Sequence, residues 1–329
     1  MGDHDKLFKR VFAVPEHASG ELRSVLPAAV VAGLDLGALE LVPGSFVDAE
    51  MVERHTDLLF RAPIVGSTGC AYVYFLLEHQ SEPDRLMPWR VLGYMHRIWE
   101  AVLRAEPERT SLPAVITVVV HHGERPWSTP RRMHDVVDGL EELPELGAFV
   151  PELDLLIDDL VVADDEALRR RPVAALPKVA LWLLRDGRDV EAFLAHLATW
   201  AGELERMVRE DRGHRDVALV VRYIWRVAGA TPFEIVRQRV IEVAPAMEET
   251  MASIEEQLIA KGIAKGIEQG FAQGVEQATR ATLARLLRAR FGSLSADVEE
   301  KIAEATIGEL DAWVERVVTA GRLEEVFDS

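Results

Sequence analysis

The chain has 329 residues, a length that suggests about two domains. Its 55 acidic and 37 basic residues give a formal net charge of −18, which argues against a protein held on DNA or on an anionic membrane by an overall positive field. Hydrophobic residues make up 49% and charged residues 28%, a balance that is typical of globular proteins and argues against disorder over the whole chain.

Cysteine content and apolar runs restrict the class of protein further. Cys70 is the single cysteine, so the sequence excludes an intramolecular disulfide and any multi-cysteine metal site. The first residues contain no apolar run of signal-peptide length, and no stretch of about 18 uncharged apolar residues occurs. We therefore expect no membrane span and a cytoplasmic location.

The first third of the chain is predicted to form helices followed by a β-hairpin. Residues 3–36 have helical apolar spacing, with breaks expected at Pro15 and Pro27. Two runs rich in aromatic and aliphatic residues, 57–61 and 70–78, flank a segment that contains Pro63 and three small turn residues. This pattern predicts a strand, a loop and a second strand, the second covered on both faces.

A helix over 86–105 and a strand over 114–120 are predicted next, which completes the core of a mixed α/β domain. We expect this helix to pack on a sheet that includes 71–78 and 114–120. Residues 153–165 contain five aspartates and are compatible with either a short strand or an acidic loop, and 172–250 have helical periodicity.

Glycine recurs every fourth residue at 262, 266, 270 and 274, inside a repeat over 257–277. On a helix these glycines form a slanting ridge, and we expect it to pack closely on another helix, from a second copy of the chain. A flexible linker is the alternative. A basic amphipathic helix over 279–291 and a helix from a capping box at Thr306 to Gly321 follow.

These features predict three parts: a domain over 1–250, a glycine-repeat linker over 251–278 and a small helical domain over 279–329. The glycine repeat and the C-terminal helices together predict a homo-oligomer.

Three polar side chains are candidates for chemistry at the ends of the predicted hairpin strands. Asp57 begins the first strand, and Glu78 and Gln80 stand at the end of the second, two residues apart and so on one side of it. Two converging carboxylates would form a hard-oxygen site suited to Mg²⁺, which can activate water and polarise a phosphoryl oxygen. Acidic residues at strand ends are more often simply solvated, and spacing alone leaves both interpretations open.

Other candidates carry weaker signals. The pair His121 and His122 ends a predicted strand, and His4 with Asp5 lies in the first helix. Each pair is compatible with catalysis or with a purely structural role. Arg90 and Tyr94 share a helix face, from which they would approach phosphate or pack against the sheet. The arginine clusters at 131–132 and 169–171 are interpreted as exposed surface rather than DNA contacts.

Several motifs resemble one protein family. They are HDKLFK at residues 4–9, DLLF at 57–60 and YFLLEHQS at 74–81, of which the LLEHQS run is the most specific. They are similar to the Rpn and YhgA-like proteins, recombination-promoting nucleases or transposases with the PD-(D/E)XK nuclease fold. The resemblance covers roughly residues 3–250, and the C-terminal end resembles a small domain often appended to such proteins.

The resemblance implies an α/β, PD-(D/E)XK nuclease-like mixed sheet flanked by helices, with a helical C-terminal region. It implies that Asp57 and Glu78 bind Mg²⁺ or Mn²⁺, with the main-chain carbonyl of His79 as a further ligand. Gln80 would occupy the place where the wider superfamily has lysine. A neutral amide can orient the attacking water but supplies no positive charge.

Two functions are compatible with these observations. The first is a Mg²⁺-dependent DNA endonuclease that promotes recombination or transposition. Because the chain is acidic overall, DNA binding would need a shielded basic groove, expected around six residues: Lys6, Lys9, Arg10, Arg61, Arg90 and Arg97. The second is a catalytically decayed nuclease-fold protein that serves as an interaction scaffold.

Overall fold

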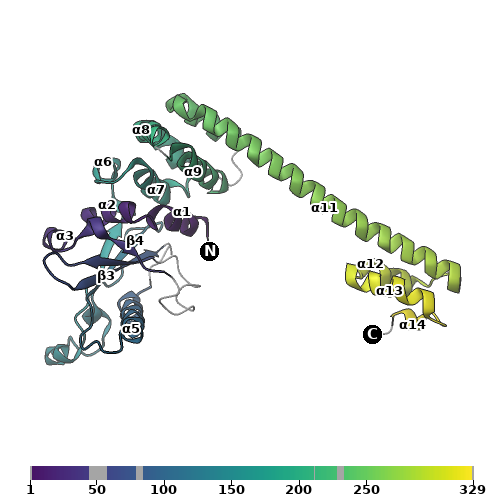
Figure 1. The fold of residues 1–329 in the computed structure, drawn as a ribbon, viewed down its shortest axis with the longest axis horizontal. Helices are drawn as coiled ribbons and strands as arrows, with labels where there is room; N and C mark the ends of the chain where they lie inside the picture. The colour runs from purple at the N-terminus through teal and green to yellow at the C-terminus, as the bar shows by residue number, and fades with distance from the viewer. Residues whose placement is uncertain (1, 44–57, 79–83, 211, 228–232, 328–329) are drawn as a thin grey trace. The chain divides into compact units, whose positions relative to one another are not determined.

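The computed structural model describes residues 2–43, 58–78, 84–210, 212–227 and 233–327. The chain divides into two compact units, Met1–Ala252 and Ser253–Ser329. A five-stranded mixed sheet forms the centre of the first unit, in the order β1-β2-β3-β4-β5, and helices cover both of its faces (Figure 1). The second unit is helical. The predicted fold class, a mixed sheet flanked by helices with a helical C-terminal region, is therefore confirmed.

Prolines divide the N-terminal helices as predicted. Helix α1 spans Asp3–Phe12, α2 spans Pro15–Val25 and α3 spans Ala28–Gly33. Pro15 is the first residue of α2, where its missing N–H costs no hydrogen bond, and Pro27 precedes α3 as its N-cap.

The predicted hairpin is present. Strand β2, Leu58–Pro63, pairs antiparallel with β3, Cys70–Glu78, in a register that sets Leu58 opposite Phe75. Gly66 in the connecting loop has a φ of +72°, a conformation that favours glycine. The sequence pattern did not predict β1, Glu40–Leu41, which adds a two-residue edge to β2.

Helices cover both faces of β3, which explains its continuous apolar run. On one face Phe8 and Phe12 of α1 contact Phe75, with ring centroids 5.8 and 6.1 Å away. On the other face α5, Met87–Ala105, packs its apolar stripe against alternate residues of β3, including Tyr74. The prediction that this helix packs on the sheet is confirmed.

Two parallel strands complete the sheet. Strand β4, Val115–His121, pairs with β3, and β5, Leu156–Asp159, pairs with β4. The aspartate-rich segment left open by the sequence thus contains a strand. Because β3, β4 and β5 run in the same direction, Glu78, His121 and Asp159 come into register at one edge.

In the helical region after the sheet, the described residues form five α-helices: α6 Asp165–Arg170, α7 Ala175–Asp186, α8 Val190–Arg209, α9 Gly213–Val227 and α10 Phe233–Val243. Helix α7 is the centre of this layer and packs on α8, α9 and α1. Trp182 of α7 and Trp200 of α8 stack with centroids 5.1 Å apart and planes 5° from parallel. The contacts of α1 with α7 and α9 bring the N-terminal helix next to helices that lie far later in the chain.

A buried ion cluster ties α2 to the sheet. Arg171 donates two hydrogen bonds to Asp158 of β5, at 2.8 and 2.7 Å, and a further one to Glu21 of α2. Glu21 is fully buried and Arg171 is 11% exposed. The expectation that residues 169–171 form an exposed cluster is therefore wrong for Arg171, although Arg170 is 78% exposed.

The C-terminal unit contains most of a long helix, α11, Glu248–Phe291, and the shorter helices α12 Ala296–Glu304, α13 Ile307–Thr319 and α14 Glu324–Phe327. Residues 257–277 lie within α11, so the predicted single helix over the glycine repeat is confirmed. Thr306 and Glu309 form the predicted capping box at the start of α13. Leu283 and Leu287 at the end of α11 share a core with the side chains of α13, including Trp313.

None of the described helices combines the length and the apolarity needed to cross a membrane. Self-association through the glycine repeat and the three-part division of the chain stay predictions.

Candidate functional site

The predicted site lies at the edge of the sheet where strands β3 and β4 end. In the last pair of the β3–β4 ladder, Glu78 is opposite His121. Because β2 runs antiparallel to β3, it begins near this edge: Leu58, the residue after Asp57, pairs with Phe75. Asp57, His79 and Gln80 lie outside the described residues, and only the backbone of Glu78 is described. Their convergence and their role as metal ligands therefore stay predictions.

His121 is fully buried beside the end of β3. Its Nε2 donates to the carbonyl oxygen of Arg125 at 2.8 Å, and the ring packs edge-on against Trp127 at 5.4 Å. The backbone N–H of Trp127 in turn donates to Asp159 at 2.8 Å. These contacts hold the segment that follows β4 against the end of β5.

His4 of α1 and His122 lie next to each other, with ring centroids 5.1 Å apart. The Tyr223 hydroxyl of α9 donates its single proton to the Leu183 carbonyl oxygen at 3.1 Å. In its 2.6 Å contact with His4 Nδ1 the hydroxyl must therefore accept, which assigns a proton to His4 Nδ1. Burial raises the pKa of Tyr223, so the hydroxyl keeps its proton. Two weak sequence candidates, His4 and His122, are thus brought together.

The remaining sequence candidates have structural contacts. Asp5 accepts the Gly2 backbone N–H at 2.7 Å and so caps α1. Arg90 donates to the Tyr94 hydroxyl at 3.3 Å and pairs with Asp84 at 3.5 Å, which confirms that Arg90 and Tyr94 share a helix face. Tyr94 packs in the core beside Tyr74, with ring centroids 5.4 Å apart.

The six residues expected around a basic groove do not gather in one place. Lys6 and Arg10 line a common hollow beside α9. Arg61 instead pairs with Glu40 of β1 at 3.3 Å, and Arg90 with Asp84. Lys6 and Arg10 therefore lie together, and the described lining of their hollow includes neither Arg61 nor Arg90, while DNA binding at such a groove stays a prediction.

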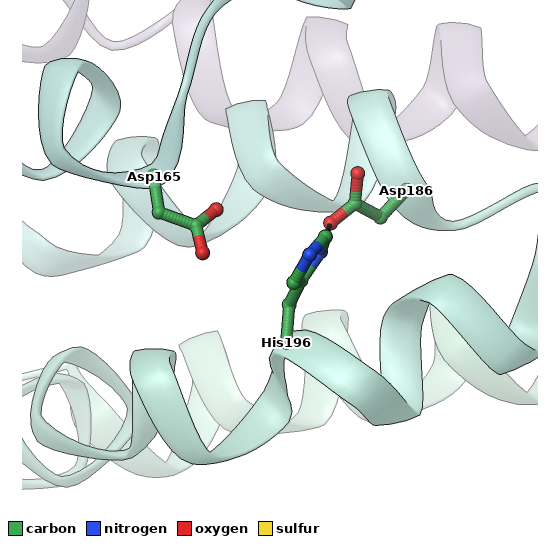
Figure 2. Close-up of side chains that lie close together, drawn as sticks. All are labelled: Asp165, Asp186 and His196. Carbon is green, nitrogen blue, oxygen red and sulfur yellow. Dashed lines mark hydrogen bonds and ion pairs between the residues drawn. The ribbon is translucent and has the colours of Figure 1, made fainter.

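A second cluster with metal-ligand chemistry lies between α6, α7 and α8. Asp165, Asp186 and His196 each offer a ligand atom, all within 4.8 Å of one another (Figure 2). His196 Nδ1 is 2.7 Å from Asp186 Oδ2. Nearby Arg185 donates to Asp165 at 2.5 Å and to Asp186 at 2.7 and 2.8 Å. The guanidinium already supplies the positive charge that a metal would bring.

The pKa of Asp186 agrees with Arg185 acting as the positive charge of the cluster. Burial acts to raise the pKa of Asp186, but hydrogen bonds from Arg185 and His196 hold the pKa below its ordinary value. Trp182 and Trp200 add indole N–H donors to Asp186 and Asp165, at 2.8 and 3.1 Å. We interpret the cluster as an ion pair that joins three helices.

Comparison with known proteins identifies the family. The family model described as "Putative transposase, YhgA-like" matches residues 2–212, about two thirds of the chain. The chain belongs to this family. The match includes α1, the whole sheet and α5 to α8, so it covers the edge at which Glu78 and His121 lie.

Curated relatives carry nuclease names. The chain is 27% identical over 260 residues to the recombination-promoting nuclease RpnA of Escherichia coli (strain K12), covering 79% of this chain and 84% of the relative. It is 30% identical over 205 residues to RpnC of the same strain, covering 61% of this chain and 64% of RpnC. It is also 26% identical over 263 residues to that strain's RpnE, covering 79% and 82%, and RpnE is named an inactive nuclease-like protein. No solved structure gives a significant match.

Proposed function

We propose that this protein is a Mg²⁺-dependent DNA endonuclease that hydrolyses phosphodiester bonds during recombination or transposition. Family membership and the nuclease names of its relatives support the nuclease class. The observation that carries the proposal is the register at the sheet edge, where β3 ends at Glu78 close to the beginning of β2. This is the arrangement that two carboxylates on adjacent strand ends need in order to share an ion.

The residue types at this edge fit magnesium. Asp57 and Glu78 offer carboxylate oxygens and His79 offers a main-chain carbonyl, the hard oxygen ligands that Mg²⁺ prefers. The single thiol, Cys70, is buried at the opposite end of β3, so it does not compete as a soft ligand. When bound, the ion would supply positive charge at the scissile phosphate and acidify water.

The protein's own residues would bind the ion and orient the nucleophile. Asp57 and Glu78 would hold the ion through their carboxylates, and the Gln80 amide would orient the attacking water by hydrogen bonding. Because an amide carries no charge, Gln80→Lys would add transition-state stabilisation, and we expect that variant to keep or raise activity.

A plasmid-nicking assay tests the proposal. We expect Asp57→Ala and Glu78→Ala to reduce nicking in Mg²⁺ and Mn²⁺ to background while the thermal unfolding temperature is retained. Glu40→Ala, which removes an exposed carboxylate from β1 of the same sheet, is the matched control and should nick like wild type.

Equal background nicking by highly pure wild type and Asp57→Ala would refute the nuclease proposal. The second candidate function, a decayed nuclease fold that acts as an interaction scaffold, would then be favoured. One observation already supports that alternative: RpnE, similar over 79% of this chain, is named inactive.

A further inference from the structure

A hollow between α1 and α9 concentrates positive charge on an acidic protein. It has a volume of about 270 Å³ and is lined by cationic residues from both helices. Lys6 and Arg10 come from α1, and Arg222 and Arg226 come from α9. One carboxylate, Asp3, lies among these four cations, so the described residues that line the hollow have a formal charge of +3 in a chain of net charge −18.

The Asp3 carboxylate forms ion pairs with two of the cations in the hollow, Lys6 and Arg226. Lys6 Nζ is 3.3 Å and Arg226 Nη1 2.9 Å from the same oxygen, Oδ1. Burial acts to raise the pKa of Asp3, yet Lys6 and Arg226 hold the pKa below its ordinary value. Two of the four cations therefore contact the same carboxylate, and the described lining of the hollow carries more positive than negative formal charge, which favours an anion from solution.

An adjoining hollow of about 500 Å³ helps to locate the anion. It shares Arg10 with the first hollow and adds Arg212 and Arg215, but it also contains three carboxylates, Glu16, Glu210 and Asp216. Its formal charges balance, so it offers no net attraction for an anion. The hollow between α1 and α9 is therefore the favoured place for a phosphate.

The hollow is connected to the sheet edge that carries Glu78. Tyr223 lines it and accepts the hydrogen bond from His4, whose ring lies 5.1 Å from that of His122. His122 directly follows His121, the residue in register with Glu78. A phosphate held in the hollow would thus lie on the α1 flank of the predicted metal site.

We propose that the hollow between α1 and α9 binds a backbone phosphate of duplex DNA on the flank of the cleaved bond. This inference rests on the proposed nuclease function, since it names the surface that holds the substrate. Arginine and lysine contacts to phosphates supply sequence-independent affinity and orient the duplex without reading bases.

The test is DNA binding without cleavage. Full-length protein in EDTA is titrated with a fluorescently labelled duplex, and anisotropy gives the dissociation constant at several salt concentrations. We expect the double variant Arg222→Ala/Arg226→Ala to bind at least about tenfold more weakly and to lower the salt slope by about two. Arg222→Lys/Arg226→Lys keeps both charges and should retain most of the affinity.

Arg239→Ala is the matched control. Arg239 lies on α10, is 55% exposed and pairs with Glu242 at 2.7 Å, whereas Arg226 is 49% exposed and pairs with Asp3 at 2.9 Å. Arg239→Ala should leave the affinity and the salt slope at wild-type values, and thermal unfolding should show all variants folded.

The outcomes separate this inference from the proposed function. Wild-type protein that binds DNA, with unchanged affinity and slope in the double alanine variant, overturns the phosphate site alone. Weaker binding with an unchanged salt slope also overturns it, because no phosphate contact was then lost. Wild-type protein that does not bind DNA at all overturns both this site and the nuclease proposal.

Discussion

Replacing Arg171 with methionine should destabilise the N-terminal unit strongly. The substitution keeps most of the side-chain volume but removes a guanidinium that is 11% exposed and that neutralises two buried carboxylates, Asp158 and Glu21. Breaking a buried ion pair by removing one partner costs about 3–5 kcal/mol. For a domain of this size that corresponds to a thermal unfolding temperature lower by about 6–20 °C.

The neighbouring residue provides the control. Arg170 is 78% exposed and pairs with Glu166 one helical turn away, an arrangement worth about 0.3–0.5 kcal/mol. Arg170→Met should therefore change the unfolding temperature by about 1–2 °C at most. The two substitutions are chemically the same and differ in how buried the arginine is. The difference between their unfolding temperatures therefore measures how much burial adds to the cost of losing the ion pair.

A third variant tests whether the buried carboxylates cause the loss of stability expected for Arg171→Met. Burial and the charge of Asp158 raise the pKa of Glu21 well above its ordinary value. Without Arg171, Glu21 must either stay ionised without its partner or be held protonated, and Glu21→Gln in the Arg171→Met background removes that cost, so it should recover part of the lost stability. Urea unfolding followed by circular dichroism gives the free energies. An Arg171→Met loss no larger than that of Arg170→Met, or no recovery by Glu21→Gln, would refute the reasoning.

Three further predictions concern helix packing and acid stability. Gly20→Ala should destabilise the protein, because an added Cβ would lie 2.5 Å from Val173 Cγ1, whereas Gly202→Ala, with nothing within 4 Å, should stabilise it by about 1 kcal/mol in chemical denaturation. The pKa of Asp186 is lower in the folded than in the unfolded state, so between these pKa values the unfolded state binds more protons and stability rises with pH. That contribution is present above the unfolded pKa and is lost as pH falls through the folded pKa, so Asp186→Asn should flatten the acid side of a plot of unfolding temperature against pH. Equal acid slopes for wild type and Asp186→Asn would contradict this assignment.

Patterns of apolar residues predicted the centre of the fold. The run from Cys70 to Glu78 has nine residues with charge only at its end, and a strand buried on both faces accounts for it. The helix over 86–105 was predicted because its apolar stripe repeats over five turns. Strand β5 was left open because its apolar run, Leu155 to Ile157, is short and has aspartates on both sides, and β1 has two residues, too few for any periodicity.

The placement of charged residues could not be predicted to the same extent. Arg170 and Arg171 are neighbours of one type, and only the tertiary position of Asp158 and Glu21 makes one of them buried. A signal for the α9 half of the hollow was nevertheless present. Arg222 and Arg226 are four residues apart, which puts them on one helix face, but sequence alone does not show that α1 packs beside it.

The hydrogen bond between His4 and Tyr223 joins residues 219 positions apart, and this separation has a consequence for synthesis in the cell. At about 5–20 residues per second, a ribosome needs about 10–40 s after translating His4 to reach Tyr223. During that interval α1 lacks its α9 partner, and the hollow between them does not exist. A nascent or truncated chain that stops before Gly213 would contain the whole sheet but only the Lys6 and Arg10 half of the proposed phosphate site. The order of translation would thus delay the proposed DNA binding until the helical layer is complete.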